Sequence, residues 1–128
     1  MKIGTKTFEE VLNEAPGMIA RLSEEYETLR SVWLVGKEDL LQLEAKTLLI
    51  LKAQHPDDKV GETKAKVDSN PDVYDERLRL IKLESDYRKK DVQVEAWKNA
   101  FAASRKIASI EIAQMENLTF NKRKKEER

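Results

Sequence analysis

The chain has 128 residues, of which 38% are charged and 40% hydrophobic, with four glycines, three prolines and no cysteine. This balance is typical of long helices, and the lack of cysteine excludes disulfides and thiolate metal sites. No apolar run approaches the roughly 20 residues that span a bilayer, and no signal peptide is recognisable. We therefore expect a soluble, cytoplasmic protein with no membrane role.

The formal net charge is zero, but the charge is distributed unevenly along the chain. Residues 1–63 carry 8 basic and 12 acidic side chains, whereas residues 64–128 carry 16 and 12, so the halves stand at −4 and +4. Any contact with a nucleic acid must therefore come from local basic clusters, or from clusters that oligomerisation brings together.

The first predicted element is a short helix over residues 7–15. Thr7 and Glu10 have the spacing of a capping box, in which each side chain accepts a hydrogen bond from an exposed amide at the helix start. Pro16 disfavours helical geometry in the residue before it, and Gly17 follows. The sequence therefore predicts a break or a sharp kink at Pro16–Gly17.

A long helix is predicted over residues 18–54. Side chains at alternating steps of three and four form a coiled-coil seam, and most of them are apolar. These seam positions are Ile19, Leu22, Tyr26, Leu29, Trp33, Gly36, Leu40, Leu43, Thr47 and Ile50. Gly36 is the weak point, because a mid-helix glycine costs about 1 kcal/mol relative to alanine, so we expect a bend or a close helix contact there.

Residues 55–70 are polar and predict a connector, in which one short helical turn around residues 62–67 is an option. A second long helix is predicted over residues 71–118, with Asn70 as its N-cap and Pro71 at its first position. It repeats the seam with Leu80, Leu83, Tyr87, Lys90, Val94, Trp97, Phe101, Ser104, Ala108, Glu111, Met115 and Leu118. Residues 121–128 contain no apolar side chain, so we expect a disordered basic tail after a single helical domain over residues 1–120.

The predicted fold is all-α: a long antiparallel helical hairpin with coiled-coil-like packing and a short N-terminal helix. Residues 40–53 are apolar on nearly every side, and one partner helix covers only one stripe of them. The remaining leucines would form a larger exposed patch than monomers usually tolerate, which predicts a homo-oligomer. The expected interface consists of Leu40, Leu41, Leu48, Leu49 and Leu51.

The sequence offers little catalytic chemistry, and we expect no enzyme, no cofactor and no metal. The single histidine, His55, lies at a helix end, where a capping or surface role is expected. Basic residues are the more informative group. Arg88, Lys89 and Lys90 form a dense cluster, and Lys122, Arg123, Lys124 and Lys125 form a cationic arm that either binds DNA or only aids solubility.

Several motifs resemble those of the phage recombination mediators of the UvsY type. Residues 43–46 (LEAK) and 51–53 (LKA) are similar to the helix of that family that reads EAxK…LKAR. The region around Tyr26 and the segment at residues 66–73 (KVDSNPDV), which opens a long second helix, also match. The resemblance covers about residues 20–115.

The resemblance implies an all-helical protein that assembles as a ring and binds single-stranded DNA. Such a protein helps a recombinase displace single-strand-binding protein, so both proteins would be partners. Lys52 matches the lysine of the family's DNA-binding LKAR motif, but Gln54 occupies the arginine position. Lys46 or the other basic residues could compensate for that difference. The alternative is a structural coiled-coil assembly or chaperone factor of a phage with no nucleic-acid role.

Overall fold

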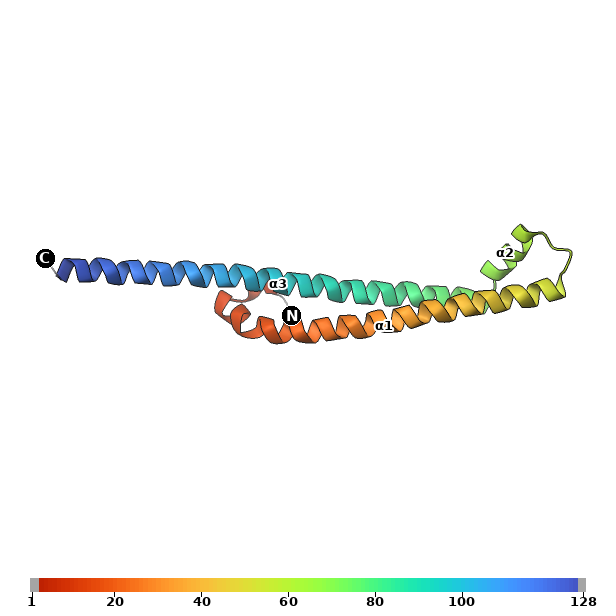
Figure 1. Ribbon diagram of the computed structural model, residues 1–128, viewed down its shortest axis with the longest axis horizontal. Helices are drawn as coiled ribbons and strands as arrows, with labels where there is room; N and C mark the ends of the chain where they lie inside the picture. The colour runs from red at the N-terminus through yellow and green to blue at the C-terminus, as the bar shows by residue number, and fades with distance from the viewer. Residues whose placement is uncertain (1–2, 127–128) are drawn as a thin grey trace. The chain divides into compact units, whose positions relative to one another are not determined.

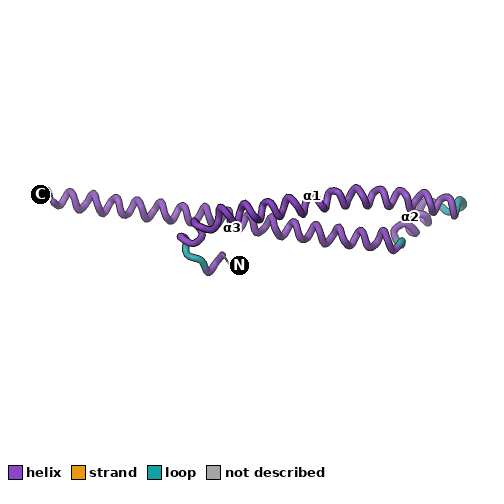
Figure 2. Tube along the Cα trace, turned by 90° about the horizontal axis from the view of Figure 1, so that it is seen from below, coloured by secondary structure: helices purple, strands orange, loops and turns teal. Residues whose placement is uncertain are grey.

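The computed structural model describes residues 3–126, and every element in that range is helical. The elements are a 3-10 turn η1 (Ile3–Thr5) and the helices α1 (Phe8–Gln54), α2 (Val60–Asp68) and α3 (Pro71–Glu126) (Figure 1). The two long helices lie side by side in both views (Figures 1 and 2). The predicted all-α class and the pairing of two long helices are therefore confirmed.

The chain forms two compact units, each built from part of α1 and part of α3. One unit contains the residues up to Ser23 and those from Asp91 onward, and the other contains Glu24–Lys90. Each is described below by itself.

The start of α1 differs from the sequence prediction. Thr7 caps the helix as expected, because its hydroxyl oxygen accepts a hydrogen bond from the Glu10 amide at 3.2 Å. The helix then continues through Pro16 instead of ending before it. A proline inside a helix removes one backbone hydrogen bond and bends the helix without having to end it. Figure 1 shows such a bend in the red N-terminal part of α1.

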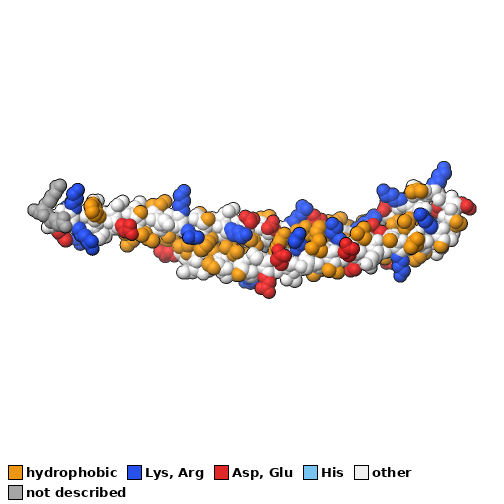
Figure 3. Space-filling model, viewed as in Figure 1, with side chains coloured by type: hydrophobic (Ala, Val, Ile, Leu, Met, Phe, Trp, Pro, Cys, Tyr) orange, Lys and Arg blue, Asp and Glu red, His pale blue; other side chains and the backbone are white. Residues whose placement is uncertain are grey.

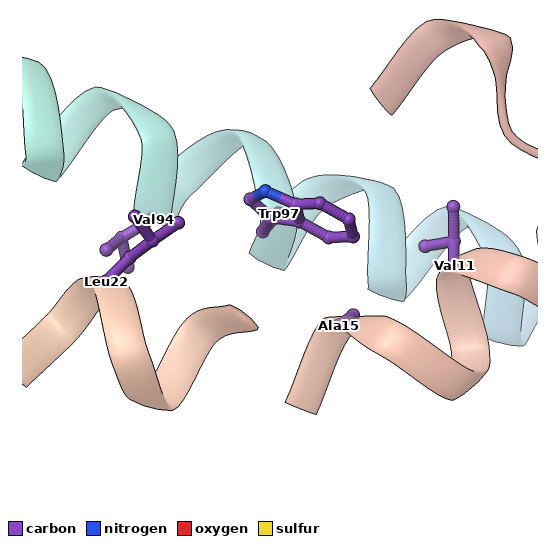
Figure 4. Close-up of a cluster of buried hydrophobic side chains, with 5 residues drawn as sticks. All are labelled: Val11, Ala15, Leu22, Val94 and Trp97. Carbon is purple, nitrogen blue, oxygen red and sulfur yellow. The ribbon is translucent and has the colours of Figure 1, made fainter. Parts of the chain in front are cut away.

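The core of the first unit explains why the helix persists across the proline. Val11 and Ala15 before the proline, and Leu22 after it, are buried together with Val94 and Trp97 of α3 (Figure 4). Burial of a large apolar side chain is worth about 1.5–3 kcal/mol, so this cluster offsets the lost hydrogen bond. The predicted seam residues Leu22, Val94 and Trp97 therefore form the core.

In the second unit, α1 packs against α3 through aromatic residues and a glycine that lie at predicted seam positions. Tyr87 of α3 packs against Tyr26 and Trp33 of α1, with ring centroids 5.7 and 5.2 Å apart. Gly36 is buried, and an added Cβ there would lie 2.5 Å from Cδ2 of Leu80. Of the two alternatives that the sequence left open for Gly36, the structure shows the close helix contact.

The connector contains a full helix where the sequence allowed one turn. Helix α2 has nine residues, and its Thr63 and Val67 are buried. These side chains are four residues apart and therefore lie on the same helical face. That buried face turns part of the predicted connector into a third packed element.

Helix α3 begins as predicted but ends later. The Asn70 side-chain oxygen accepts hydrogen bonds from the amides of Asp72 (3.0 Å) and Val73 (3.3 Å), which confirms the N-cap. The helix continues to Glu126 instead of ending near residue 118, so residues 121–126 are helical and not disordered. Four cations near a helix C-terminus interact favourably with its dipole, which the prediction of disorder did not consider. Residues 127–128 of the predicted tail lie outside the described residues.

Candidate functional site

An open groove of about 470 Å³ lies in the second unit, where α1, α2 and the start of α3 meet. Its apolar lining comes from two helices: Leu41, Ala45 and Leu48 of α1, and Val60 and Val67 of α2. Leu41 and Val60 are 58% and 83% exposed, so apolar side chains here face solvent. A surface of this kind is typical of a binding site for another apolar side-chain stripe.

One end of the groove is fixed by an ion-pair cluster that joins all three helices. Arg77 of α3 donates hydrogen bonds to Glu44 of α1 (3.2 Å) and to Asp68 at the end of α2 (2.9 Å). The hydrogen bond that Arg77 donates to Asp68, followed by the one to Glu44, raises the pKa of the Arg77 guanidinium above its ordinary value. Two carboxylates share one guanidinium, so this end of the groove retains an excess of negative charge.

Two lysines also line the groove. Lys52 lies in the last turn of α1 and Lys64 lies on α2, and both line the groove. Both are exposed, and no ion pair joins either of them to a described residue. Nearby, Lys66 pairs with Asp58, and this hydrogen bond lowers the pKa of the Asp58 carboxyl. The groove therefore combines an apolar lining with two unpaired lysines and the ion-pair cluster of Arg77.

The structure does not bring Lys46 and Lys52 together. They are six residues apart on one helix, which places their side chains about 120° apart around its axis. Both are exposed. The predicted site on α1 is thus two separate free cations, one of which belongs to the groove.

The cluster Arg88, Lys89 and Lys90 is largely neutralised within the chain. Arg88 pairs with Glu84, and Lys90 pairs with Glu25 of α1 at 2.8 Å. Lys89 is exposed and has no ion pair within the described range. Of the three predicted DNA contacts, Lys89 is the one that is available without breaking an internal pair.

The predicted cationic arm extends from the end of α3 as part of the helix. Lys122, Arg123, Lys124 and Lys125 are all exposed. Successive residues of a helix point about 100° apart, so these four charges surround the axis instead of forming one stripe. Figure 3 shows basic and hydrophobic side chains next to each other on this part of α3.

The predicted oligomer interface is only partly accessible. Leu41 and Leu49 are 58% and 68% exposed, whereas Leu40, Leu48 and Leu51 are half-buried. The groove brings α2 alongside this end of α1, so the chain itself covers part of the surface that the sequence assigned to other copies. Leu41 and Leu48 remain on the groove wall.

Sequence reasoning missed Val60, Lys64 and Arg77 as groove residues. Val60 and Lys64 lie in the predicted connector, and Arg77 lies in the predicted second long helix, where no site is assigned to it. The four-residue spacing of Thr63 and Val67 is the signal that indicates a packed α2.

Comparison with family models, curated proteins and solved structures finds no match to this sequence. Within residues 3–126, none of the helices combines the length and apolarity that crossing a membrane requires.

Proposed function

We propose that this protein binds single-stranded DNA as a homo-oligomer and acts as a recombination mediator that helps to load a recombinase. The observation that carries the proposal is a group of exposed lysines that form no ion pair with a described residue, among them Lys46, Lys52 and Lys89. Lys52 occupies the lysine position of the LKAR-like segment, at the end of α1. The resemblance over residues 20–115 implies that a recombinase and a single-strand-binding protein are partners.

A near-neutral chain can hold DNA in this way only if several copies act together. Each lysine–phosphate contact contributes modestly and depends on salt, but contacts from several subunits on one strand add through effective concentration. The exposed apolar side chains of the groove support self-association. Weak individual contacts also suit a protein that must pass the strand to a recombinase.

The proposed DNA binding is tested by a salt titration. The affinity for a fluorescent oligo-dT strand is measured by fluorescence anisotropy at a series of salt concentrations. Lys46→Gln with Lys52→Gln should weaken binding and make the slope of log affinity against log salt shallower by about 1.4 per subunit, or 0.7 per lost contact. The matched control, Arg79→Gln with Lys98→Gln, removes two cations that already pair with Glu76 and Glu95. An unchanged slope and affinity in the first variant would exclude the α1 lysines.

A structural coiled-coil assembly without a nucleic-acid role is the second candidate. The continuous three–four seam and the exposed apolar side chains favour it. The same titration separates the two functions, because this candidate predicts no binding of oligo-dT by the wild-type protein even at low salt.

A further inference from the structure

One exposed aromatic ring lies beside the cations at the end of α3. Of the aromatic side chains, only Phe120 (65%) and Tyr74 (56%) are exposed, and the others are at least partly buried. Every residue from Ser109 to Glu126 is exposed, so Phe120 lies on a part of the helix where no described side chain is buried. Single exposed apolar side chains are common on protein surfaces, so the role of Phe120 depends on its neighbours.

Two cations are neighbours of Phe120 on the helix surface. Arg123 and Lys124 follow it by three and four residues, the spacing that places side chains on one face. Helical side chains lean toward the N-terminus, so both cations lean toward the ring. Phe120 and Arg123 line one open groove of about 380 Å³, and Glu116 also lines it. An engineered cavity of about 150 Å³ holds one benzene, so this groove has room for a planar ring against Phe120.

The positive charge at this helix end has no acidic partner in the described chain. Lys122, Arg123, Lys124 and Lys125 form no ion pair with a described residue. Three of them, Lys122, Lys124 and Lys125, line a second open groove of about 660 Å³. The two linings share no residue, and at 100° per residue they lie on opposite sides of the helix. The end of α3 therefore presents cations on both sides.

This arrangement of charge indicates which kind of anionic partner fits. A flat membrane meets one side of a helix, and membrane-surface helices accordingly separate an apolar face from a basic one. Here the exposed side chains of Ile112 and Leu118 are about 120° apart around the axis, and cations lie on both sides. A second copy of this helix end would bring four more cations to the same place, and like charges repel. A flexible single strand can follow the charge around the helix, and each of its bases offers a planar face that stacks on an aromatic ring.

We infer that single-stranded DNA binds at the end of α3, with one base stacked on Phe120 and the neighbouring phosphates held by Arg123 and Lys124. Glu116 at the same groove repels phosphate and accepts hydrogen bonds from the N–H groups of a base, so it favours a base at this position. This inference rests on the proposed function and adds to it a contact that the α1 lysines do not provide. The cationic arm then binds DNA, which is one of the two roles that the sequence left open for it.

The test measures the affinity of the full chain for oligo-dT at a series of salt concentrations. Phe120→Leu keeps an apolar side chain but removes the ring, so affinity should fall about tenfold, as for one lost stacked base, while the salt slope stays unchanged. Arg123→Gln with Lys124→Gln should instead make the slope shallower by about 1.4 per subunit. Tyr74→Leu is the matched control, because Tyr74 is exposed on the same helix but Arg77, three residues on, is already paired.

A Phe120→Trp variant gives a direct signal of stacking. It should retain wild-type affinity, and its exposed indole should lose fluorescence when a base stacks on it. The wild-type chain supplies the background signal of Trp33 and Trp97, which are half-buried and buried. Far-UV circular dichroism and sedimentation velocity without DNA verify that each variant retains its helices and its assembly.

Four results would overturn the inference. Wild-type affinity in Phe120→Leu, together with weakened binding by Lys46→Gln with Lys52→Gln, would refute stacking and leave the proposed function intact. Loss of self-association in Phe120→Leu would assign the ring to a contact between copies. Weaker binding of Phe120→Leu to vesicles of phosphatidylcholine and phosphatidylserine, but not to oligo-dT, would assign the helix end to a membrane. No binding of oligo-dT by the wild-type chain at low salt would contradict the proposed function itself.

Discussion

Two glycines inside α1 have different surroundings. A Cβ at Gly17 would meet nothing within 4 Å, whereas a Cβ at Gly36 would meet the buried side chain of Leu80 at 2.5 Å. The seam spacing predicted that Gly36 faces the partner helix, because the position can be counted along the chain. The spacing could not predict whether Gly36 would allow a bend or a close helix contact, because the outcome depends on the side chain that lies opposite on α3.

We expect the two alanine substitutions to have opposite effects. Gly17→Ala should raise the free energy of unfolding by about 0.5–1 kcal/mol, because alanine favours the helix. Gly36→Ala gains the same helix propensity but must displace Leu80, and overpacking a core costs about 1–3 kcal/mol. Urea unfolding followed by circular dichroism should therefore place Gly36→Ala at least about 1 kcal/mol below Gly17→Ala. Equal stabilisation by both would mean that the helices are not in close contact at Gly36.

The three helices differ in how well their sequences predict them. The seams of α1 and α3 are long and periodic, so the spacing predicts both helices and the face on which each helix packs against the other. The predicted break at Pro16 was wrong because burial of Val11 and Ala15 outweighs a local backbone preference. Helix α2 was underestimated because tertiary packing of Thr63 and Val67 stabilises it, and one pair of residues at four-residue spacing is a weak signal by itself.

The exposed end of α3 permits a test at the level of the element. Deletion of residues 109–128 should change the free energy of unfolding of the monomer by less than about 1 kcal/mol, because every described residue in it, from 109 to 126, is exposed. Urea unfolding at a concentration below that of self-association measures this value. Trp97→Ala provides the contrast, because loss of a buried tryptophan costs about 3–5 kcal/mol.

A large destabilisation by the deletion would show that residues 109–128 contribute to the fold of the single chain.

At the scale of the whole molecule, the sequence predicts the charge distribution but not which charges are free. Arg88 and Lys90 belong to a dense basic cluster in the sequence, yet each is paired with a glutamate. Lys90 pairs with Glu25 because the hairpin brings distant parts of the chain together. For the same reason, Lys52 and Lys64 could not be assigned to one groove without the position of α2.

The two units differ in how far apart in the sequence their contacting residues are, and this difference affects the order in which the units fold. In the unit formed by Glu24–Lys90, the helices meet across a short connector, and Arg77 and Glu44 are 33 residues apart. In the other unit, Leu22 meets Val94, so the intervening loop is roughly twice as long and its closure costs about 0.6 kcal/mol more in entropy. Contacts between nearer residues also form faster.

We therefore expect the hairpin to form from the connector outward. In pulsed hydrogen exchange during refolding, amides around Leu43 and Leu80 should gain protection before those around Val11 and Trp97. In the native state, the amides of the later unit should exchange first. Simultaneous protection of both regions would mean that the two units fold in a single step.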